Sequence, residues 1–220
     1  MAPSREEWDS AVARIAAFER HVDRYEKWFV RYAAAYESEI RAIRSLVPAG
    51  GTGVEIGVGT GRFAAPLGVK VGVEPSQAMG KVAQSRGIRV IGGVAEALPL
   101  AEEAFDFALM VTTICFLDDV RTSLREARRV IRTGGLLIVG LVDRGSFLGR
   151  RYETHKHLNP FYADATFYSA DQVVSYLQEA GFRDFAFAQT IFHDLGEIEE
   201  VEAPIEGYGR GSFVAMRALK

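Results

Sequence analysis

The sequence predicts an α/β fold, a mostly parallel sheet whose strands are connected by helices. Between residues 53 and 142, short apolar runs of strand length alternate with segments of helical periodicity. Two further strand-like runs, 182–192 and 211–219, have no helical pattern between them. Strands connected without a helix pair antiparallel. The sheet is therefore expected to begin parallel, with right-handed crossovers, and to finish in an antiparallel hairpin.

Composition excludes several classes of protein. The 220 residues are 48% hydrophobic and 25% charged, with a formal net charge of −3, which is typical of a globular chain and not of a disordered one. The most apolar stretch, 136–142, is far shorter than the ~20 residues of a membrane span. No basic and apolar leader is seen at the N-terminus, so we expect a cytoplasmic protein. The slightly acidic charge does not favour nucleic acid as a partner.

The first elements in the chain are helices. Residues 4–47 contain neither glycine nor proline, and apolar residues recur in them at helical spacing. The first proline after them is Pro48. A single straight helix of this length would extend past a small domain, so a break is expected near residues 21–30. We interpret residues 1–47 as a helical cap that forms one compact unit with a main domain of residues 48–220.

The main domain begins with a glycine-rich loop, 49–53, and the strands and helices follow it. Strands are predicted, in chain order, at residues 53–56, 69–73, 89–91, 105–111 and 136–142. Helices are predicted at 76–85 and at 119–131, the second closed by two glycines. Capping-box spacing opens another helix at 169–180. Between them, residues 146–165 are aromatic and basic, without clean periodicity.

A glycine turn follows the first predicted strand and leads into a helical pattern. Gly57, Gly59 and Gly61 stand at alternate positions, which lets the backbone turn tightly and approach a ligand. The dinucleotide fingerprint requires a third glycine where this chain has Arg62. The second strand ends at Glu74, whose carboxylate can accept hydrogen bonds from two vicinal ribose hydroxyls. A nucleoside ligand is therefore expected at these strand ends.

These motifs resemble those of the class I S-adenosylmethionine-dependent methyltransferases. The resemblance begins with residues 55–61 and 73–76, which match the first two motifs of the family. Later segments match in order: 95–100 with 105–106, 126–135 and 167–182. It covers about residues 50–219 and is closest to the type 11 subgroup, which resembles ubiquinone and menaquinone biosynthesis methyltransferases. It implies a Rossmann-like, seven-stranded sheet, S-adenosylmethionine as cofactor, and methyl transfer to a small molecule with release of S-adenosylhomocysteine.

The resemblance also implies where the cofactor lies. Glu55 would be near the methionine amino group, the glycines would border the methionine, and Glu74 would hold the ribose. The full set expected at the cofactor is Tyr25, Trp28, Glu55, Gly57, Val58, Gly59, Gly61, Glu74, Pro75, Ser76, Val94, Ala95, Glu96, Val111, Thr112 and Thr113. Relatives commonly carry an acid where this chain has Val94, so a backbone carbonyl or Glu96 takes the adenine amino group, or affinity is reduced.

The acceptor side of the site has no motif that names a substrate. An acceptor that is a hydroxyl or an acidic carbon needs a general base, and the candidates, unranked, are His155, His157, Tyr152 and Tyr168. No metal site is expected, because the two histidines are two residues apart and no other ligands accompany them. We place acceptor specificity in the cap and in residues 146–168.

Two alternatives stay open. One is a nicotinamide-dependent oxidoreductase, which Arg62 and the antiparallel finish disfavour. The other is a non-catalytic regulator or partner subunit that binds S-adenosylmethionine, which Val94 and the lack of an evident base keep in view. Cofactor binding distinguishes the first from a methyltransferase, and turnover distinguishes the second.

Overall fold

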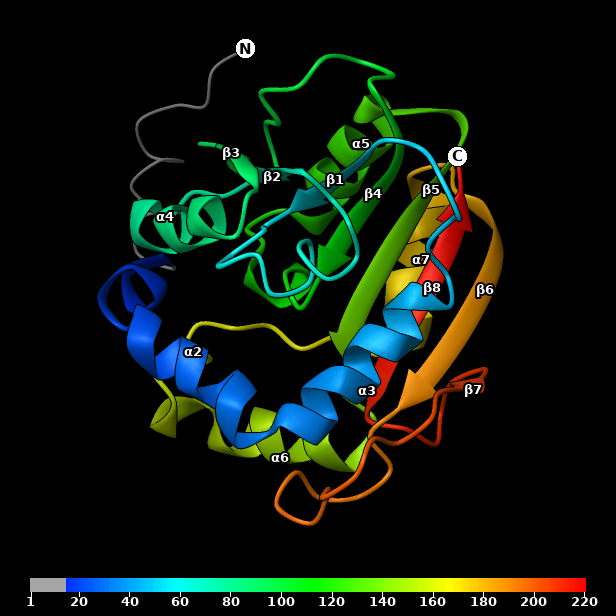
Figure 1. Ribbon diagram of the computed structural model, residues 1–220. Helices are drawn as coiled ribbons and strands as arrows, with labels where there is room; N and C mark the ends of the chain where they lie inside the picture. The colour runs from blue at the N-terminus through cyan, green and yellow to red at the C-terminus, as the bar shows by residue number, and fades with distance from the viewer. Residues whose placement is uncertain (1–14) are drawn as a thin grey trace.

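The protein forms one mixed sheet flanked by helices, seen here in a computed structural model that describes residues 15–220 (Figure 1). The eight strands lie in the order β3-β2-β1-β4-β5-β8-β6-β7. Their bounds are β1 Gly53–Ile56, β2 Val71–Val73, β3 Arg89–Ile91, β4 Phe105–Val111, β5 Ile131–Val142, β6 Arg183–Thr190, β7 Ile205–Glu206 and β8 Phe213–Leu219. Strands β1 to β5 pair parallel, and β8 pairs antiparallel with both β5 and β6.

The predicted fold class and antiparallel finish are confirmed. The sheet has eight strands, whereas seven were predicted. The additional strand is β7, whose two residues pair antiparallel with the edge of β6. This strand comes from an acidic, loop-like segment in which a pairing of two residues leaves no periodic pattern. The predicted strands at 69–73, 182–192 and 211–219 are each shorter in the structure. Strand β5 is longer and begins at Ile131, directly after the helix, because Ile131 already pairs with Phe105 before a bulge.

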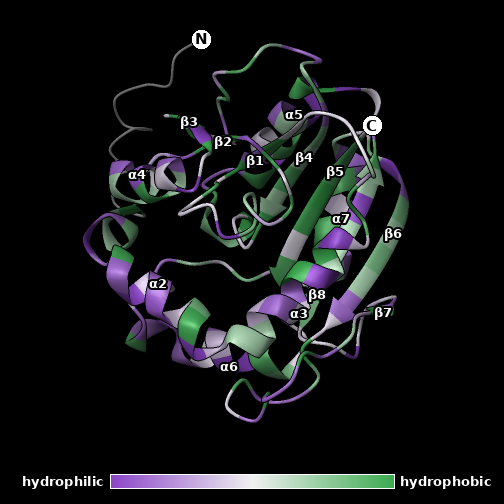
Figure 2. Ribbon diagram, in the orientation of Figure 1, coloured by the Kyte–Doolittle hydropathy of each residue, from purple (hydrophilic) through white to green (hydrophobic). Residues whose placement is uncertain are grey.

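Helices cover both faces of the sheet. Helices α5 (Val120–Val130) and α7 (Ala170–Glu179) pack on one face, while α3 (Ala33–Arg44) and α4 (Gln77–Ser85) pack on the other. The side chains of β4 alternate between the two layers: Phe105 and Met110 face the first, and Leu109 and Val111 face the second. Strands buried on both faces carry a nearly continuous apolar sequence, as Figure 2 shows for β4 and β5.

The predicted break in the N-terminal helical region is confirmed, and a second one is present. The helix that includes residues 15–20 is interrupted at His21, α2 (Val22–Arg31) follows, and Tyr32 separates α2 from α3. The prediction for residues 4–14 lies outside the described part of the chain. Helix α2 and helix α6 (Phe147–His155) lie beyond the arrowheads of β4 and β5 in Figure 1, at the carboxyl ends of the parallel strands.

An ion cluster ties α2 to the glycine turn. The Glu26 carboxylate is paired with the guanidinium of Arg62 and, at 2.5 Å, with that of Arg86. Arg86 also donates a hydrogen bond to the carbonyl of Thr60, at 2.5 Å. The arginine that breaks the dinucleotide fingerprint therefore anchors α2, a function that the sequence pattern did not indicate.

The Glu26 cluster should make stability depend on acid pH. Burial raises the pKa of Glu26, but its hydrogen bonds to Arg86 and Arg62 outweigh that effect and lower the pKa from 4.5 to about 2. A pKa that folding lowers contributes stability that is complete above about 4.5 and is lost as the pH falls toward 2. We expect Glu26→Gln to lower the free energy of unfolding by about 1–3 kcal/mol at pH 7.

Urea denaturation of the variant and the wild type at several pH values checks this expectation. The difference between the two proteins should shrink as the pH falls below about 4.5. The matched control is Glu37→Gln, because Glu37 and Arg41 form an exposed pair on α3, and such pairs contribute about 0.2–1 kcal/mol. An equal loss for both variants at pH 7 would contradict the assigned role of Glu26.

Candidate functional site

A cavity of about 560 Å³ lies at the carboxyl ends of the parallel strands, and its volume is typical of small-molecule sites. One wall comes from the loops after β1, β2, β3 and β4, and the other from α2, α3, α6 and the segment that follows α6. The sheet order reverses between β1 and β4. Ligands of open α/β sheets bind outside the strand ends at this switch point.

The glycine turn forms the floor of the cavity. Gly57, Gly59 and Gly61 all have positive φ, at 72°, 53° and 79°, the region that side chains with a Cβ rarely enter. A Cβ on Gly57 would lie 2.4 Å from the Thr113 side chain. Gly61 is different, because its Cβ would lie 2.4 Å from Ile88 and it is absent from the cavity wall. Its missing side chain therefore serves packing.

Glu74, at the end of β2, joins the turn to the neighbouring strand. Its side chain lines the cavity and is only 9% exposed. One carboxylate oxygen accepts a hydrogen bond from the Gly59 amide at 2.8 Å, and the other from the Ser76 amide at 2.9 Å. Burial raises the pKa of Glu74 to about 7, although these two amides oppose the rise. Each oxygen keeps a lone pair that can accept a ligand hydroxyl.

Glu55 lies in β1, behind the turn. It is 1% exposed and does not line the cavity. Its Oε2 atom has no hydrogen-bond partner among the described residues, and burial raises its pKa well above the ordinary value, with the Ala64 amide opposing. An unpaired buried acceptor costs about 1–3 kcal/mol, so a donor that reached this oxygen would stabilise the protein.

The loop after β3 forms another part of the wall, with Val94, Ala95 and Glu96 in it. The Glu96 carboxylate accepts hydrogen bonds from the amides of Asp118 at 2.9 Å and Asp119 at 3.3 Å. It therefore supports the loop that leads into α5. If Glu96 accepted the adenine amino group, its carboxylate would have to serve that group as well as these two amides. A backbone carbonyl that accepted the amino group would not have this competition.

The end of β4 carries a strained residue at the cavity wall. Thr112 has a φ of 52°, which is rare for a β-branched side chain. Its amide donates to the carbonyl of Gly140 at 2.7 Å, which holds this conformation. Such strain is often found at ligand sites. Thr112, with Val111 and Thr113, lines the cavity, and no sequence pattern indicated its conformation.

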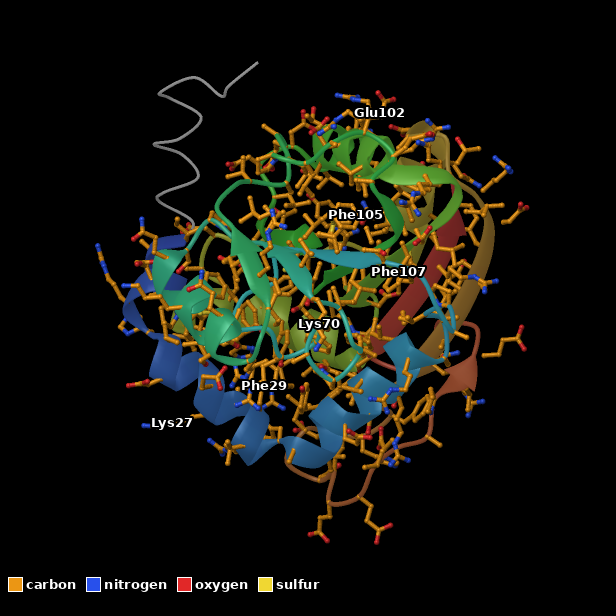
Figure 3. The ribbon with its side chains drawn as sticks, turned by 45° about the horizontal axis from the view of Figure 1, so that its top comes forward. Lys27, Phe29, Lys70, Glu102, Phe105 and Phe107 are labelled. Atoms are coloured by element: carbon orange, nitrogen blue, oxygen red, sulfur yellow. The ribbon has the colours of Figure 1, made fainter. Side chains whose placement is uncertain are left out.

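Aromatic side chains line the cavity on both sides. They come from four segments distant in sequence: Phe18, Tyr25, Trp28, Phe29, Tyr32, Phe116, Tyr152, Phe161, Tyr162, Phe167 and Tyr168. Phe18 packs edge to face on Phe116 at 5.0 Å, which joins the first helix to the segment after β4. Figure 3 shows Phe29 on the side of α2 that faces the sheet, and Lys27 on the side that faces away. Trp28 and Phe29 both line the cavity, and Phe29 is also buried.

The structure gathers most of the predicted site residues in one place. Those in the cavity wall are Tyr25, Trp28, Gly57, Gly59, Glu74, Pro75, Val94, Ala95, Glu96, Val111, Thr112, Thr113, Tyr152 and Tyr168. Those outside the wall are Glu55, Val58, Gly61, Ser76, His155 and His157. Val58 packs on Gly72 in the core, and the Ser76 hydroxyl accepts from the Met79 amide to cap α4.

The two histidines do not reach the cavity. Both are exposed, and Nδ1 of His155 lies 3.0 Å from the carbonyl of Arg151, one turn earlier in α6. They were predicted together with Tyr152 because the segment is aromatic and basic throughout, so the sequence does not indicate which face of α6 is buried. Tyr152, in the same helix, does line the cavity.

Sequence reasoning missed one buried acidic residue of the wall. Glu39, in α3, is 5% exposed and lines the cavity. Burial raises its pKa to about 8. The signal was available: Glu39 lies in the apolar stripe of α3, three residues after Tyr36 and four before Ile43, where a carboxyl is unusual.

Comparison with known proteins gives matches along the whole chain. A family model of a methyltransferase domain matches residues 54–139. A crystal structure from Thermotoga maritima, of an S-adenosylmethionine-dependent methyltransferase and possible histamine N-methyltransferase, superposes with a TM-score of 0.92. It is 52% identical, and the match covers 94% of this chain and 99% of that one.

Two curated relatives extend these matches but carry no assigned activity. An uncharacterized protein of Methanocaldococcus jannaschii is 45% identical over 203 residues, 92% of this chain and 98% of its own length. An uncharacterized protein of Mycobacterium tuberculosis is 34% identical over 217 residues, 96% of this chain and 76% of its own length. In residues 15–220, none of the helices has the length and apolar character needed to cross a membrane.

Proposed function

This chain belongs to the S-adenosylmethionine-dependent methyltransferases, and we propose that it methylates a small molecule held between the strand ends and the helical cap. The observation that carries the proposal is the meeting of the glycine turn with the buried Glu74 carboxylate in the wall of the cavity. In this proposal residues 1–47 are the cap and residues 48–220 the methyltransferase domain. The cap must open to exchange cofactor and product.

The residues present fit S-adenosylmethionine. The carboxylate of Glu74 would hold the ribose hydroxyls, and the turn at Gly57 and Gly59 has no side chain that would obstruct the methionine portion. The unpaired oxygen of Glu55 would receive the methionine ammonium, directly or through water. The adenine would lie beside residues 94–96, with a backbone carbonyl as the acceptor of its amino group.

The bound cofactor supplies a methyl group that is already activated by a sulfonium. The protein has to place the acceptor atom in line behind the methyl carbon, which lowers the barrier by several kcal/mol. The aromatic wall can exclude water from the reacting atoms. Burial raises the pKa of Tyr152 above its ordinary range, with the charge of Glu39 adding to the effect. We therefore assign Tyr152 the role of a hydrogen-bond donor to the acceptor rather than that of a base.

Turnover with a panel of acceptors tests this proposal. Purified protein would be incubated with methyl-labelled S-adenosylmethionine and with amines, phenols, thiols and carboxylic acids, including histamine because of the relative from Thermotoga maritima. We expect release of S-adenosylhomocysteine that depends on one acceptor class. Binding of S-adenosylhomocysteine without turnover on any class would contradict the proposal and favour a non-catalytic, cofactor-binding protein.

A further inference from the structure

Glu39 is buried in the cavity wall. It is 5% exposed, and within residues 15–220 no side chain makes a hydrogen bond or an ion pair with its carboxyl group, since burial is the single cause that raises its pKa. It lines the cavity, so its carboxyl group is within reach of a ligand. A carboxyl buried without a partner lowers stability. A ligand that supplied the missing donor would offset that cost.

Three tyrosines from different segments line the same cavity as Glu39. The charge of Glu39 adds to burial in raising the pKa values of Tyr25, Tyr152 and Tyr162, so all three phenols stay protonated. The rings of Tyr152 and Tyr162 are 5.0 Å apart. Their faces and hydroxyls, together with one carboxylate, form a group that suits a cation, because aromatic faces attract positive charge.

The described cations of the cavity do not compensate Glu39. All of those that line it are exposed: Arg24, Lys27, Arg31 and Arg151. Arg151 is already paired with Asp194, and Arg31 lies 5.2 Å from the ring centre of Tyr32. Two buried side chains of the cavity wall carry an ionisable acidic group, Glu39 and Glu74. The interior of the cavity therefore favours positively charged ligands.

Glu39 enters the cavity wall from α3, whereas most residues assigned to the cofactor come from the loops after β1 to β4. Tyr25 lines the same cavity, and the charge of Glu39 contributes, with burial and the charges of Glu55 and Glu74, to raising its pKa. The Tyr25 hydroxyl lies 3.6 Å from the position that a Cβ on Gly59 would take. A group held by Glu39 next to Tyr25 would therefore face the methionine end of the cofactor.

We propose that the acceptor is a small amine, and that Glu39 binds its ammonium group and takes its proton. This inference rests on the proposed function and narrows it to one substrate class. The ammonium would donate a charge-assisted hydrogen bond to the carboxylate while its positive charge faces the three tyrosines. Glu39 then touches the substrate directly, and its removal should affect the amine and not the cofactor.

The proton and the electrons balance as follows. An N–H bond of the ammonium breaks, and its proton forms an O–H bond with Glu39. The nitrogen lone pair then forms a bond to the methyl carbon while the carbon–sulfur bond breaks, and that electron pair stays on sulfur. The methylated amine leaves as a cation, and Glu39 returns its proton to water. Burial alone raises the pKa of Glu39 to about 8, which favours its keeping the proton once the amine has become neutral.

A matched pair of ligands tests the proposal. In the presence of saturating S-adenosylhomocysteine, 2-phenylethylamine and 2-phenylethanol, which differ in charge and not in shape, would be titrated by calorimetry. We expect the wild type to bind the amine at least tenfold more tightly than the alcohol. In Glu39→Gln the amine should lose at least tenfold in affinity, while the alcohol and S-adenosylhomocysteine stay within about twofold. Glu37→Gln, an exposed carboxylate on the same helix, is the control and should behave as the wild type.

The outcomes separate this inference from the proposed function. Failure to bind S-adenosylhomocysteine would overturn the proposed function. Normal binding of S-adenosylhomocysteine with no preference for the amine, or with a preference that survives in Glu39→Gln, would overturn only the inference. Glu39→Gln is expected to melt at or above the wild-type temperature, because it removes an unpaired buried carboxyl. If Glu39→Gln does not fold, the wild-type protein still tests whether the amine binds more tightly than the alcohol, and equal affinities would overturn the inference.

Discussion

Replacing Gly57 by alanine is expected to lower the affinity for S-adenosylhomocysteine at least tenfold and to destabilise the protein. The backbone at Gly57 has a φ of 72°, and the left-handed region costs a residue with a Cβ about 1–2 kcal/mol. The new Cβ would also lie 2.4 Å from Cγ2 and 2.6 Å from Oγ1 of Thr113. Overpacking of this kind costs about 1–3 kcal/mol more. The free energy of unfolding should therefore fall by about 2–5 kcal/mol, as measured by urea denaturation.

Gly68 offers a matched control for this prediction. Its φ is 77°, but no atom lies within 4 Å of the position that a Cβ would take. Gly68→Ala should therefore show the backbone strain alone, about 1–2 kcal/mol, with the affinity for S-adenosylhomocysteine unchanged within about twofold. Equal losses of affinity in the two variants would show that the contact between Gly57 and Thr113 does not shape the site.

The second large effect is expected at Glu74. Replacement by alanine removes the acceptor of the Gly59 and Ser76 amides together with the carboxylate assigned to the ribose. Charged hydrogen bonds of this kind contribute about 1–3 kcal/mol, so we expect S-adenosylmethionine to bind about 5- to 150-fold more weakly by calorimetry. Glu179→Gln, an exposed carboxylate paired with Arg121, is the control. Affinity within twofold of the wild type for Glu74→Ala would remove Glu74 from the site.

The same residue gives a prediction for pH. Folding raises the pKa of Glu74 to about 7, from an ordinary value of 4.5. A carboxyl whose pKa is raised by folding favours the folded state at low pH, and this contribution is lost as the pH rises from about 4.5 through 7. Glu74→Gln removes this dependence. Without ligand, the variant should therefore gain stability relative to the wild type between pH 5 and pH 8. A difference in the free energy of unfolding that stays constant over this range would contradict the raised pKa of Glu74.

Local patterns predicted much of the fold. The strands at 53–56, 89–91 and 105–111 were predicted at their observed bounds, because buried parallel strands are continuous apolar runs bounded by loops. The helix at 169–180 was recognisable from its capping box, which the structure contains at Ser169 and Gln172. Strand β7 was not recognisable, because two residues paired at an edge depend on their neighbour and not on their own sequence.

The candidate site was predictable only where a motif carried it. The turn and the carboxylate at Glu74 follow from spacing, but the partner of Arg62 is Glu26, 36 residues earlier in the chain. The acceptor side is built from aromatic residues of separate segments, and contacts between them, such as Phe18 with Phe116, leave no periodic signal. Glu39 is an intermediate case, since a carboxyl in an apolar helical stripe was visible, whereas the cavity that it lines was not.

A titration of the purified wild-type protein with S-adenosylmethionine, S-adenosylhomocysteine and NADH by calorimetry tests the central claim most directly. The buried Glu74 carboxylate and the open glycine turn predict one site for each adenosyl compound, with dissociation constants on the order of micromolar, and no binding of NADH. Absence of binding by both adenosyl compounds, or binding of NADH in their place, would contradict the account.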